Sequence, residues 1–255
     1  MIFHVEQIIE GEVKIVQPDS KIWFRTLCVK NGLTPTDLQL NQLNQYVNLL
    51  LDWNKKINLI SRKDEENVWT YHILHSISPL FKMKIFEGSK IVDIGCGGGL
   101  PGIPLKILRP DISLICIDAT RKKANAVSQM VNKLKLENVG VIWGRAEEIG
   151  MQPEYLHRFD FTIARAVCQL NELIALSICF LREQNYTRSI EKLFNSELID
   201  PKPPALIAFK GGNLAKEINI AKRKYPQVNV KAIDLAFTGS EQLIAIDKKI
   251  LLVHP

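Results

Sequence analysis

The segment best suited to bind a ligand is a glycine-rich turn that follows a short apolar run. Residues 90–94 form the apolar run and carry an acidic side chain, Asp93, just before the turn. Glycine then recurs at every second position, at Gly95, Gly97 and Gly99. Because glycine has no Cβ and tolerates positive φ, a ligand can lie directly against this backbone. Pro101 follows where a helix would begin, and proline suits a first helical position. The pattern predicts a strand, a ligand-binding turn and a helix.

The glycine spacing separates two classes of nucleotide-like ligand. A dinucleotide fingerprint requires G-x-G-x-x-G, and Leu100 occupies the place of its third glycine. The spacing found, Asp93-x-Gly95-x-Gly97-x-Gly99, resembles the first motif of S-adenosylmethionine-dependent methyltransferases. The sequence also lacks a Tyr-x-x-x-Lys pair, so no nicotinamide cofactor is expected. A glycine turn without any ligand is the alternative.

Polar side chains also follow the later predicted strands, whose carboxyl ends form the ligand crevice of an open α/β sheet. Asp118 comes 23 residues after Gly95, near the spacing of about 20 expected for an acid that binds ribose hydroxyls. An ionised carboxylate accepts two hydrogen bonds at once, which suits a vicinal diol. Capping of the next helix through Thr120 is its alternative role. Ala146 and Glu147 follow the third strand, where an adenine edge would rest.

Alternating strand and helix patterns from residue 89 onward predict the fold. The expected strands are 90–94, 113–117, 139–143, 159–163 and 205–209. Helical patterns separate them, which favours a mostly parallel sheet covered on both faces. Residues 228–234 and 242–253 are expected to add antiparallel end strands. The predicted fold class is therefore α/β and Rossmann-like, with a mostly parallel seven-stranded sheet.

The sequence before residue 89 predicts helices rather than strands. Thr36 offers a side-chain oxygen to cap a helix, and leucine and valine recur behind it at helical spacing. A second helix is expected from Asp64. The predicted organisation is an N-terminal extension of unassigned role (1–33), a helical lead-in domain (34–88) and a ligand-binding domain (89–255) that contains an insertion (182–203).

Composition predicts a cytoplasmic protein whose net positive charge permits a polyanionic partner. The 255 residues carry a net charge of +6 and are 46% hydrophobic, which is ordinary for a globular chain with a real core. The five cysteines are odd in number and form no C-x-x-C pair, as expected for reduced thiols in the cytosol. No apolar stretch approaches the roughly 18 residues that a membrane span needs.

Several basic and aromatic positions are candidates for contact with RNA, since single-stranded RNA is read by stacking and by cationic side chains. The RNA candidates are Arg62, Lys63, His72, Lys122, Lys123 and Lys210. A solvated basic surface is the alternative for the lysines and arginines, and a structural histidine is the alternative for His72. Arg165 can pair with a cofactor carboxylate, an RNA phosphate or a structural acid. His72 and His75 lack a third nearby ligand, so no metal site is expected.

Four motifs together resemble one family of RNA-modifying enzymes. They are Asp93-Ile-Gly95-Cys-Gly97-Gly-Gly99-Leu-Pro101-Gly102-Ile-Pro104-Leu, Gly144-Arg145-Ala146-Glu147-Glu148, Ala164-Arg165-Ala166, and Trp53-Asn54-Lys55-Lys56-Ile57-Asn58-Leu59 with His72. They are similar to those of the bacterial 16S ribosomal RNA guanine-N7 methyltransferases, the glucose-inhibited division protein B family. The resemblance implies a class I methyltransferase fold, S-adenosyl-L-methionine as cofactor, S-adenosyl-L-homocysteine as product, and 16S rRNA or the small-subunit particle as partner. By position it implies cofactor contacts at Gly95, Leu100, Asp118, Ala119, Thr120, Ala146, Glu147 and Arg165, with Gly97 added as part of the turn.

The chemistry expected of a guanine N7 acceptor fits what the sequence lacks. N7 is an exposed lone pair without a proton, so no general base is needed, and positioning can supply most of the acceleration. The sequence has neither the Pro-Cys or Thr-Cys pair of cytosine-C5 enzymes nor the Asp/Asn-Pro-Pro-aromatic motif of amino-group methylators. Two alternatives remain open: a methyltransferase for a small molecule or protein, and a non-catalytic RNA-binding module. A nicotinamide-dependent reductase is disfavoured, because both of its motifs are missing.

Overall fold

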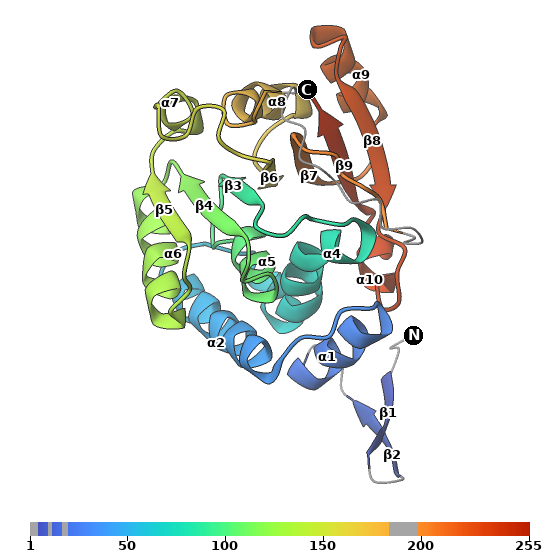
Figure 1. The fold of residues 1–255 in the computed structure, drawn as a ribbon. Helices are drawn as coiled ribbons and strands as arrows, with labels where there is room; N and C mark the ends of the chain where they lie inside the picture. The colour runs from blue at the N-terminus through green and yellow to red at the C-terminus, as the bar shows by residue number, and fades with distance from the viewer. Residues whose placement is uncertain (1–4, 10–11, 17–19, 184–197) are drawn as a thin grey trace.

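The computed structural model describes residues 5–9, 12–16, 20–183 and 198–255, and its centre is a seven-stranded sheet (Figure 1). The strands are β3 (Lys90–Ile94), β4 (Ser113–Asp118), β5 (Val139–Trp143), β6 (Phe161–Arg165), β7 (Ala205–Gly211), β8 (Asn229–Asp234) and β9 (Lys248–His254). Their order is β5-β4-β3-β6-β7-β9-β8. All neighbouring pairs are parallel except the two made by β9. The predicted fold class and all five central strands are confirmed.

Side chains that alternate along the strands divide the core into two layers, one on each face of the sheet. Ile91, Ile207 and Leu252 belong to one buried cluster, and their chain neighbours Val92, Ala208 and Val253 belong to the other. This alternation is the two-residue period of a strand. Both faces are therefore apolar, as a sheet covered on both sides requires. The helices α5 (Gly102–Leu108) and α6 (Arg121–Leu134) cover the first face, and α7 (Ala146–Ile149), α8 (Leu170–Ile178) and α9 (Ala215–Lys224) cover the second.

The helices before residue 89 pack onto the first face. Helix α2 (Asp37–Asn54) begins as the sequence predicts, because Thr36 and Gln39 form a reciprocal capping box. Its buried side chains share a cluster with strand residues, and Gln39 also donates to the last carbonyls of α5. Helix α1 (Lys21–Lys30) was not expected from the sequence. The strands β1 (Val5–Ile9) and β2 (Glu12–Val16) form their own antiparallel pair. The domain boundaries at residues 33 and 88 stay predictions.

The second lead-in helix differs from the regular helix expected from Asp64. It consists of a 3₁₀ helix (Arg62–Asn67), a π-helical turn (Trp69–Leu74), α3 (His75–Ile77) and α4 (Pro79–Lys82). Pro79 lacks a backbone N–H and cannot continue a regular ladder. The π-helical turn is a local widening of a kind that often occurs at functional sites.

Two further expectations meet the structure at the end of the chain. The expected strand at 242–253 is wrong at its start, because α10 (Glu241–Ala245) is a short helix and β9 begins only at Lys248. Asp247 has a positive φ of 52°, which turns the chain between the two elements. The expected insertion at 182–203 falls mostly on 184–197, which lie outside the described residues.

The sheet order places a crevice at the centre of the molecule. From β3 the chain runs through β4 to β5 on one side, and then crosses to β6 on the other side of β3. The loops that leave β3 and β6 therefore diverge at their carboxyl ends, which is where open α/β sheets bind ligands. Within the described residues, no helix is both long and apolar enough to cross a membrane.

Candidate functional site

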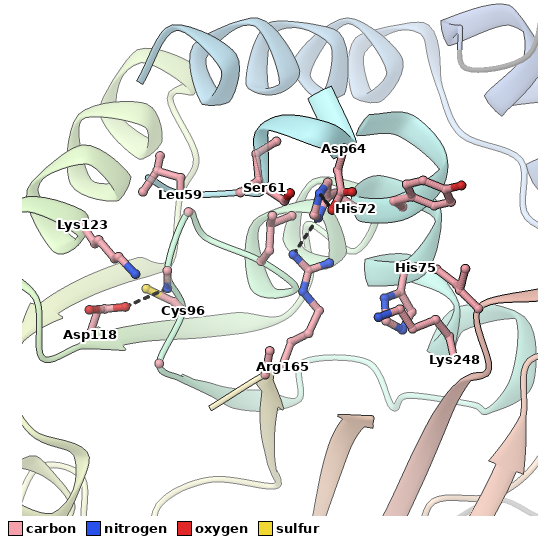
Figure 2. Close-up of a pocket in the computed structure, with 18 residues that line it drawn as sticks. Leu59, Ser61, Asp64, His72, His75, Cys96, Asp118, Lys123, Arg165 and Lys248 are labelled. Carbon is pink, nitrogen blue, oxygen red and sulfur yellow. Dashed lines mark hydrogen bonds and ion pairs between the residues drawn. The ribbon is translucent and has the colours of Figure 1, made fainter. Parts of the chain in front are cut away.

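A cavity of about 540 Å³ lies at the carboxyl ends of β3, β4 and β6. Its floor is the glycine turn after β3, and its walls come from the lead-in segment, from Arg165 at the end of β6 and from Lys248 at the start of β9. Figure 2 shows Asp118 and Cys96 at one end of this cavity and His75 and Lys248 at the other, with Arg165 between them. The site thus brings together residues that are more than 180 positions apart in the sequence.

Helix α2 contacts the backbone of the glycine turn directly. The hydroxyl of Tyr46 donates to the carbonyl of Gly98 at 2.9 Å, and both lie in the interior. A Cβ at Gly98 would lie only 2.7 Å from Leu50, so the helix packs directly on the backbone. Gly97 has a φ of +59° and open space where a Cβ would project. Because Gly97 lines the cavity, that space opens into the cavity.

Asp118 is hydrogen-bonded to the backbone of two loops and still lines the cavity. Its Oδ1 accepts from the N–H of Thr120 and its Oδ2 from the N–H of Gly97, both at 2.8 Å. It therefore fixes the residue that precedes α6 and also the glycine turn, but it does not cap the helix itself. The carboxylate still lines the cavity. Each of its oxygens has a second lone pair, so a hydroxyl pair in the cavity can bind without displacing the backbone donors.

Arg165, His72 and Asp64 form a chain of polar contacts across the cavity wall (Figure 2). Arg165 Nη2 donates to His72 Nδ1 at 3.1 Å, and His72 Nε2 lies 3.3 Å from Asp64 Oδ2. An arginine can only donate, so Nδ1 accepts and the imidazole proton sits on Nε2, facing the carboxylate. Burial and the charges of Arg165 and Lys248 lower the pKa of His72 to about 3. His72 is therefore a neutral link at physiological pH.

Asp93 lies under the turn and supports it from inside the sheet. It is fully buried, and its Oδ2 accepts from the N–H of Gly102 at 2.8 Å. Among the described residues its Oδ1 has no hydrogen-bond partner. Burial raises the pKa of Asp93 to about 7, against the opposing effects of Gly102 and Arg165. A Cβ at Gly102 would lie 2.7 Å from this carboxylate, so only glycine admits the contact.

The far end of the cavity is polar and basic. His75 is 2% exposed, and its ring packs edge-on against Phe209 with centroids 5.3 Å apart. Its Nε2 has no hydrogen-bond partner within the described parts of the chain. Burial and Arg165 lower the pKa of Lys248. Burial lowers the pKa of His75 well below its ordinary value, and the charges of Arg165 and Lys248 lower it further.

A second cavity adjoins the first and is called the basic groove here. It is lined by residues 58–63 and by Lys123, and it shares Leu59, Ile60, Ser61 and Lys123 with the first cavity. Asn54 holds this shared wall, because its Oδ1 accepts from the N–H groups of Leu59 and Ile60 at 2.8 and 2.9 Å. The cationic side chains Arg62, Lys63 and Lys123 therefore lie next to the cavity mouth.

The structure brings together five of the predicted cofactor residues: Gly95, Gly97, Leu100, Asp118 and Arg165 line the cavity. The other four, Ala119, Thr120, Ala146 and Glu147, do not line it. The backbone of Thr120 is bonded to Asp118, and Glu147 lies 3.5 Å from Arg145 Nη1.

The predicted RNA candidates also divide. His72 and Lys123 line the cavity, and Arg62 and Lys63 line the basic groove. Lys122 is exposed on α6 and lines neither. Lys210 is only 13% exposed and forms an ion pair with Glu217, and its Nζ also donates to the carbonyl of Cys168 at 2.7 Å. The fold therefore ties Lys210 to α9 instead of presenting it to a partner.

Sequence reasoning missed Asp64, His75 and Lys248 as site residues. Lys248 had no signal, because its position depends on β9 entering the sheet between β7 and β8. His75 was considered only for metal binding, and among the described residues no three potential ligands gather around a common point. Asp64 did carry a signal, since it is an acid directly after two basic residues in an RNA candidate segment.

The family profile and the curated relatives name the same family. The sequence profile of the GidB family, described as rRNA small subunit methyltransferase G, matches residues 39–193. Ribosomal RNA small subunit methyltransferase G of Alkaliphilus oremlandii (strain OhILAs) is 33% identical over 217 residues, which cover 84% of each chain. The protein of the same name from Lactococcus lactis subsp. cremoris (strain SK11) is 37% identical over 185 residues, which cover 72% of this chain and 77% of the relative. Among solved structures, a SAM-dependent methyltransferase from Aquifex aeolicus is similar with a TM-score of 0.49 and 14% identity, over 75% of this chain and 95% of that one. The chain belongs to the rRNA small subunit methyltransferase G family.

Proposed function

We propose that this enzyme transfers a methyl group from S-adenosyl-L-methionine to N7 of a guanine in 16S ribosomal RNA and releases S-adenosyl-L-homocysteine. The observation that carries the proposal is the direct connection between a glycine-floored cavity and the basic groove. The first suits a small zwitterionic nucleoside, and the second suits a polyanionic strand. A cytoplasmic site of action follows from the substrate.

The residues at the floor of the cavity fit the cofactor. Gly97 leaves open the space that a Cβ would fill, so a ligand can approach the backbone. Asp118 presents a carboxylate for the ribose hydroxyls, and Arg165 presents a guanidinium for the methionine carboxylate. When bound, the cofactor supplies an electrophilic methyl group on a sulfonium.

The side chains around the cavity favour a reaction that depends on positioning. Cys96 is the cysteine that lines the cavity, and burial together with its contact to Cys116 raises its pKa well above the ordinary value. A protonated thiol is a poor nucleophile, so a covalent route through Cys96 is disfavoured. His72 is neutral and uses Nδ1 as an acceptor for Arg165. These features suit an acceptor such as N7, whose lone pair needs no base.

The basic groove supports RNA as the macromolecular substrate. Arg62, Lys63 and Lys123 lie along one groove, next to the wall that it shares with the cofactor cavity. Cations spaced along a groove neutralise successive phosphates and release counterions. A strand bound there would bring a nucleotide to the mouth of the cavity.

Two measurements test the proposal in order. Calorimetry with S-adenosyl-L-methionine and with NAD should show binding of the first only. Transfer of tritium from labelled cofactor should then mark 16S RNA or small subunits from a deletion strain, and cleavage mapping should locate an N7-methylguanosine. Label in a protein or small-molecule fraction instead would favour a different methyltransferase, and failure to bind the cofactor would favour a non-catalytic RNA-binding protein.

A further inference from the structure

We propose that Asp64 binds the Watson–Crick edge of the acceptor guanine, through its N1–H and its 2-amino group. The inference rests on the proposed function, because it assigns the acceptor half of the same cavity. Asp64 would thus be the residue that selects guanine among the bases.

The position of Asp64 separates it from the cofactor end of the cavity. Figure 2 shows it beyond Arg165, on the side away from Asp118 and Cys96, and it lines the cavity from the lead-in segment. It directly follows Arg62 and Lys63, which line the basic groove. Asp64 therefore lines the cavity directly after the last lead-in residue of the groove, three residues from the shared Ser61. A base turned out of a strand in the groove would meet this carboxylate on its way in.

The charge of Asp64 is unexpected for a place that receives RNA. Burial lowers the pKa values of Arg165 and Lys248, and the negative charge of Asp64 partly opposes that lowering, so Asp64 lies within electrostatic reach of both cations. In the sequence it also directly follows two cationic residues of the groove. A carboxylate repels phosphate, so it weakens the groove unless it binds something else. Guanine carries two adjacent donors, N1–H and N2–H, and a carboxylate is an acceptor with two oxygens. Adenine and cytosine each present an acceptor at the ring nitrogen of that edge and cannot make this pair.

The carboxylate of Asp64 lies beside a neutral histidine and remains reachable from the cavity. The Nε2–H of neutral His72 faces its Oδ2 at 3.3 Å, and His72 is itself fixed by Arg165. The Asp64 side chain remains 34% exposed. Within the described residues His72 Nε2 makes no hydrogen bond, so the lone pairs of both Asp64 oxygens remain available to a ligand.

The same carboxylate suits the charge change of the reaction. The N7 lone pair forms the new N–C bond, the S–C bond breaks with its electrons left on sulfur, and the positive charge passes to the purine ring. N7 lies across the purine from the 2-amino group, so a base held by Asp64 keeps N7 free. A fixed negative group beside the ring favours the charge that develops there.

Inosine at the mapped target position tests the proposal, since it lacks only the 2-amino group. We expect kcat/KM of the wild type to fall about tenfold or more on small subunits assembled with inosine, the usual effect of losing a hydrogen bond to a charged group. Asp64→Asn should have a low kcat/KM on subunits with guanosine at the target position. Replacing that guanosine with inosine should lower the kcat/KM of this variant by no more than about twofold further. Glu66→Gln removes one negative charge from an exposed neighbour in the same 3₁₀ helix and should keep the wild-type ratio.

The outcomes separate this inference from the proposed function. If Asp64→Asn keeps the wild-type preference for guanosine over inosine while folded, Asp64 does not read the base, and the methyltransferase activity stands. If Asp64→Asn binds cofactor poorly, its contact with His72 is structural and the inference is overturned. Asp64→Ala serves as the second variant should the first not fold. A wild type that neither binds S-adenosyl-L-methionine nor methylates RNA overturns the proposed function itself.

Discussion

The guanidinium of Arg165 donates to Nδ1 of His72, 3.1 Å away, across 93 residues of sequence. An arginine at the end of a central strand thus depends on a neutral histidine from the lead-in segment. Protonation of that histidine would place two cations in contact inside the protein. The contact therefore couples the stability of the site to pH.

Stability should fall in acid because of His72. Its pKa is lowered to about 3 in the folded protein and is about 6.5 when unfolded, so the unfolded chain binds the extra proton between these values. The free energy of unfolding should then decrease by up to about 1.4 kcal/mol per pH unit as pH falls below 6.5. Full stability from this group is present above that pH. His72→Asn keeps an acceptor for Arg165 and removes the titration.

Urea unfolding of the wild type and His72→Asn between pH 4.5 and 7.5 measures this effect. His75 adds to the decline in acid, and buried Asp93, with its pKa raised to about 7, opposes it, because its folded form gains stability as pH falls. Subtracting the two curves removes both contributions. A difference that does not change with pH would show that His72 titrates normally in the fold.

Alanine at two glycines of the turn should affect different properties, cofactor affinity at Gly97 and fold stability at Gly99. Gly97→Ala has room for its Cβ and should cost only about 1–2 kcal/mol for the left-handed backbone. That Cβ enters the cavity, so cofactor affinity should fall by a factor of ten or more. Gly99→Ala would bring a Cβ to 2.7 Å from Ile103 at a φ of +90°, and should destabilise the fold first. Thermal unfolding and calorimetry separate the two effects, and equal losses in both variants would contradict the assignment.

Loss of the Asp118 carboxylate should weaken the cofactor site twice over. Asp118→Ala removes the ribose acceptor and also releases the N–H groups of Gly97 and Thr120. We expect cofactor affinity to fall by about 1–3 kcal/mol, the range for a hydrogen bond to a charged group, together with a lower melting temperature. Asp118→Asn keeps the shape and should lose less of both. Calorimetry that finds normal affinity in a folded Asp118→Ala protein would remove Asp118 from the site.

The basic groove predicts a salt dependence that a merely solvated surface does not. Arg62→Ala with Lys63→Ala should lower RNA affinity and reduce the slope of log K against log salt by about 0.7 per lost phosphate contact. Cofactor affinity should stay nearly unchanged. Lys222→Ala with Arg223→Ala is the matched control, since it removes the same charge from exposed positions on α9, on the other face of the sheet. Equal slopes for the two double variants would exclude the groove as the RNA surface.

Local sequence signals were sufficient for the central sheet and for the glycine turn. Apolar runs fix β3 to β7, and the Thr36 capping box fixes the start of α2, because each depends on neighbours in the chain. The hydrogen-bond partners of Asp118 and Arg165 could not be predicted in the same way. The backbone donors on Asp118 depend on the fold of the turn, and the partner of Arg165 comes from a distant segment.

The far end of the cavity could not be read from the sequence for a physical reason. Lys248 reaches it because β9 inserts antiparallel between two parallel strands, an arrangement that no local pattern encodes. The π-helical turn at 69–74 likewise turns His72 toward Arg165 in a way that regular helical spacing does not predict. Lys210 lies at a strand end as expected, but it forms an ion pair with Glu217 on the next helix.

The wall formed by Leu59, Ile60 and Ser61 lines both the cavity and the basic groove. If the cofactor and RNA both contact this wall and the wall can move, the binding of one changes the affinity for the other. Linkage then requires reciprocity: the factor by which RNA alters the dissociation constant of the cofactor equals the factor by which the cofactor alters that of RNA. S-adenosyl-L-methionine and S-adenosyl-L-homocysteine differ only at the central sulfur atom, where the first carries a methyl group and a positive charge. If the position of this wall depends on the methyl group or its charge, RNA affinity would fall once the methyl group has left the sulfur. Asn54 anchors the wall through two backbone N–H groups, so it would set the coupling free energy between the two binding equilibria.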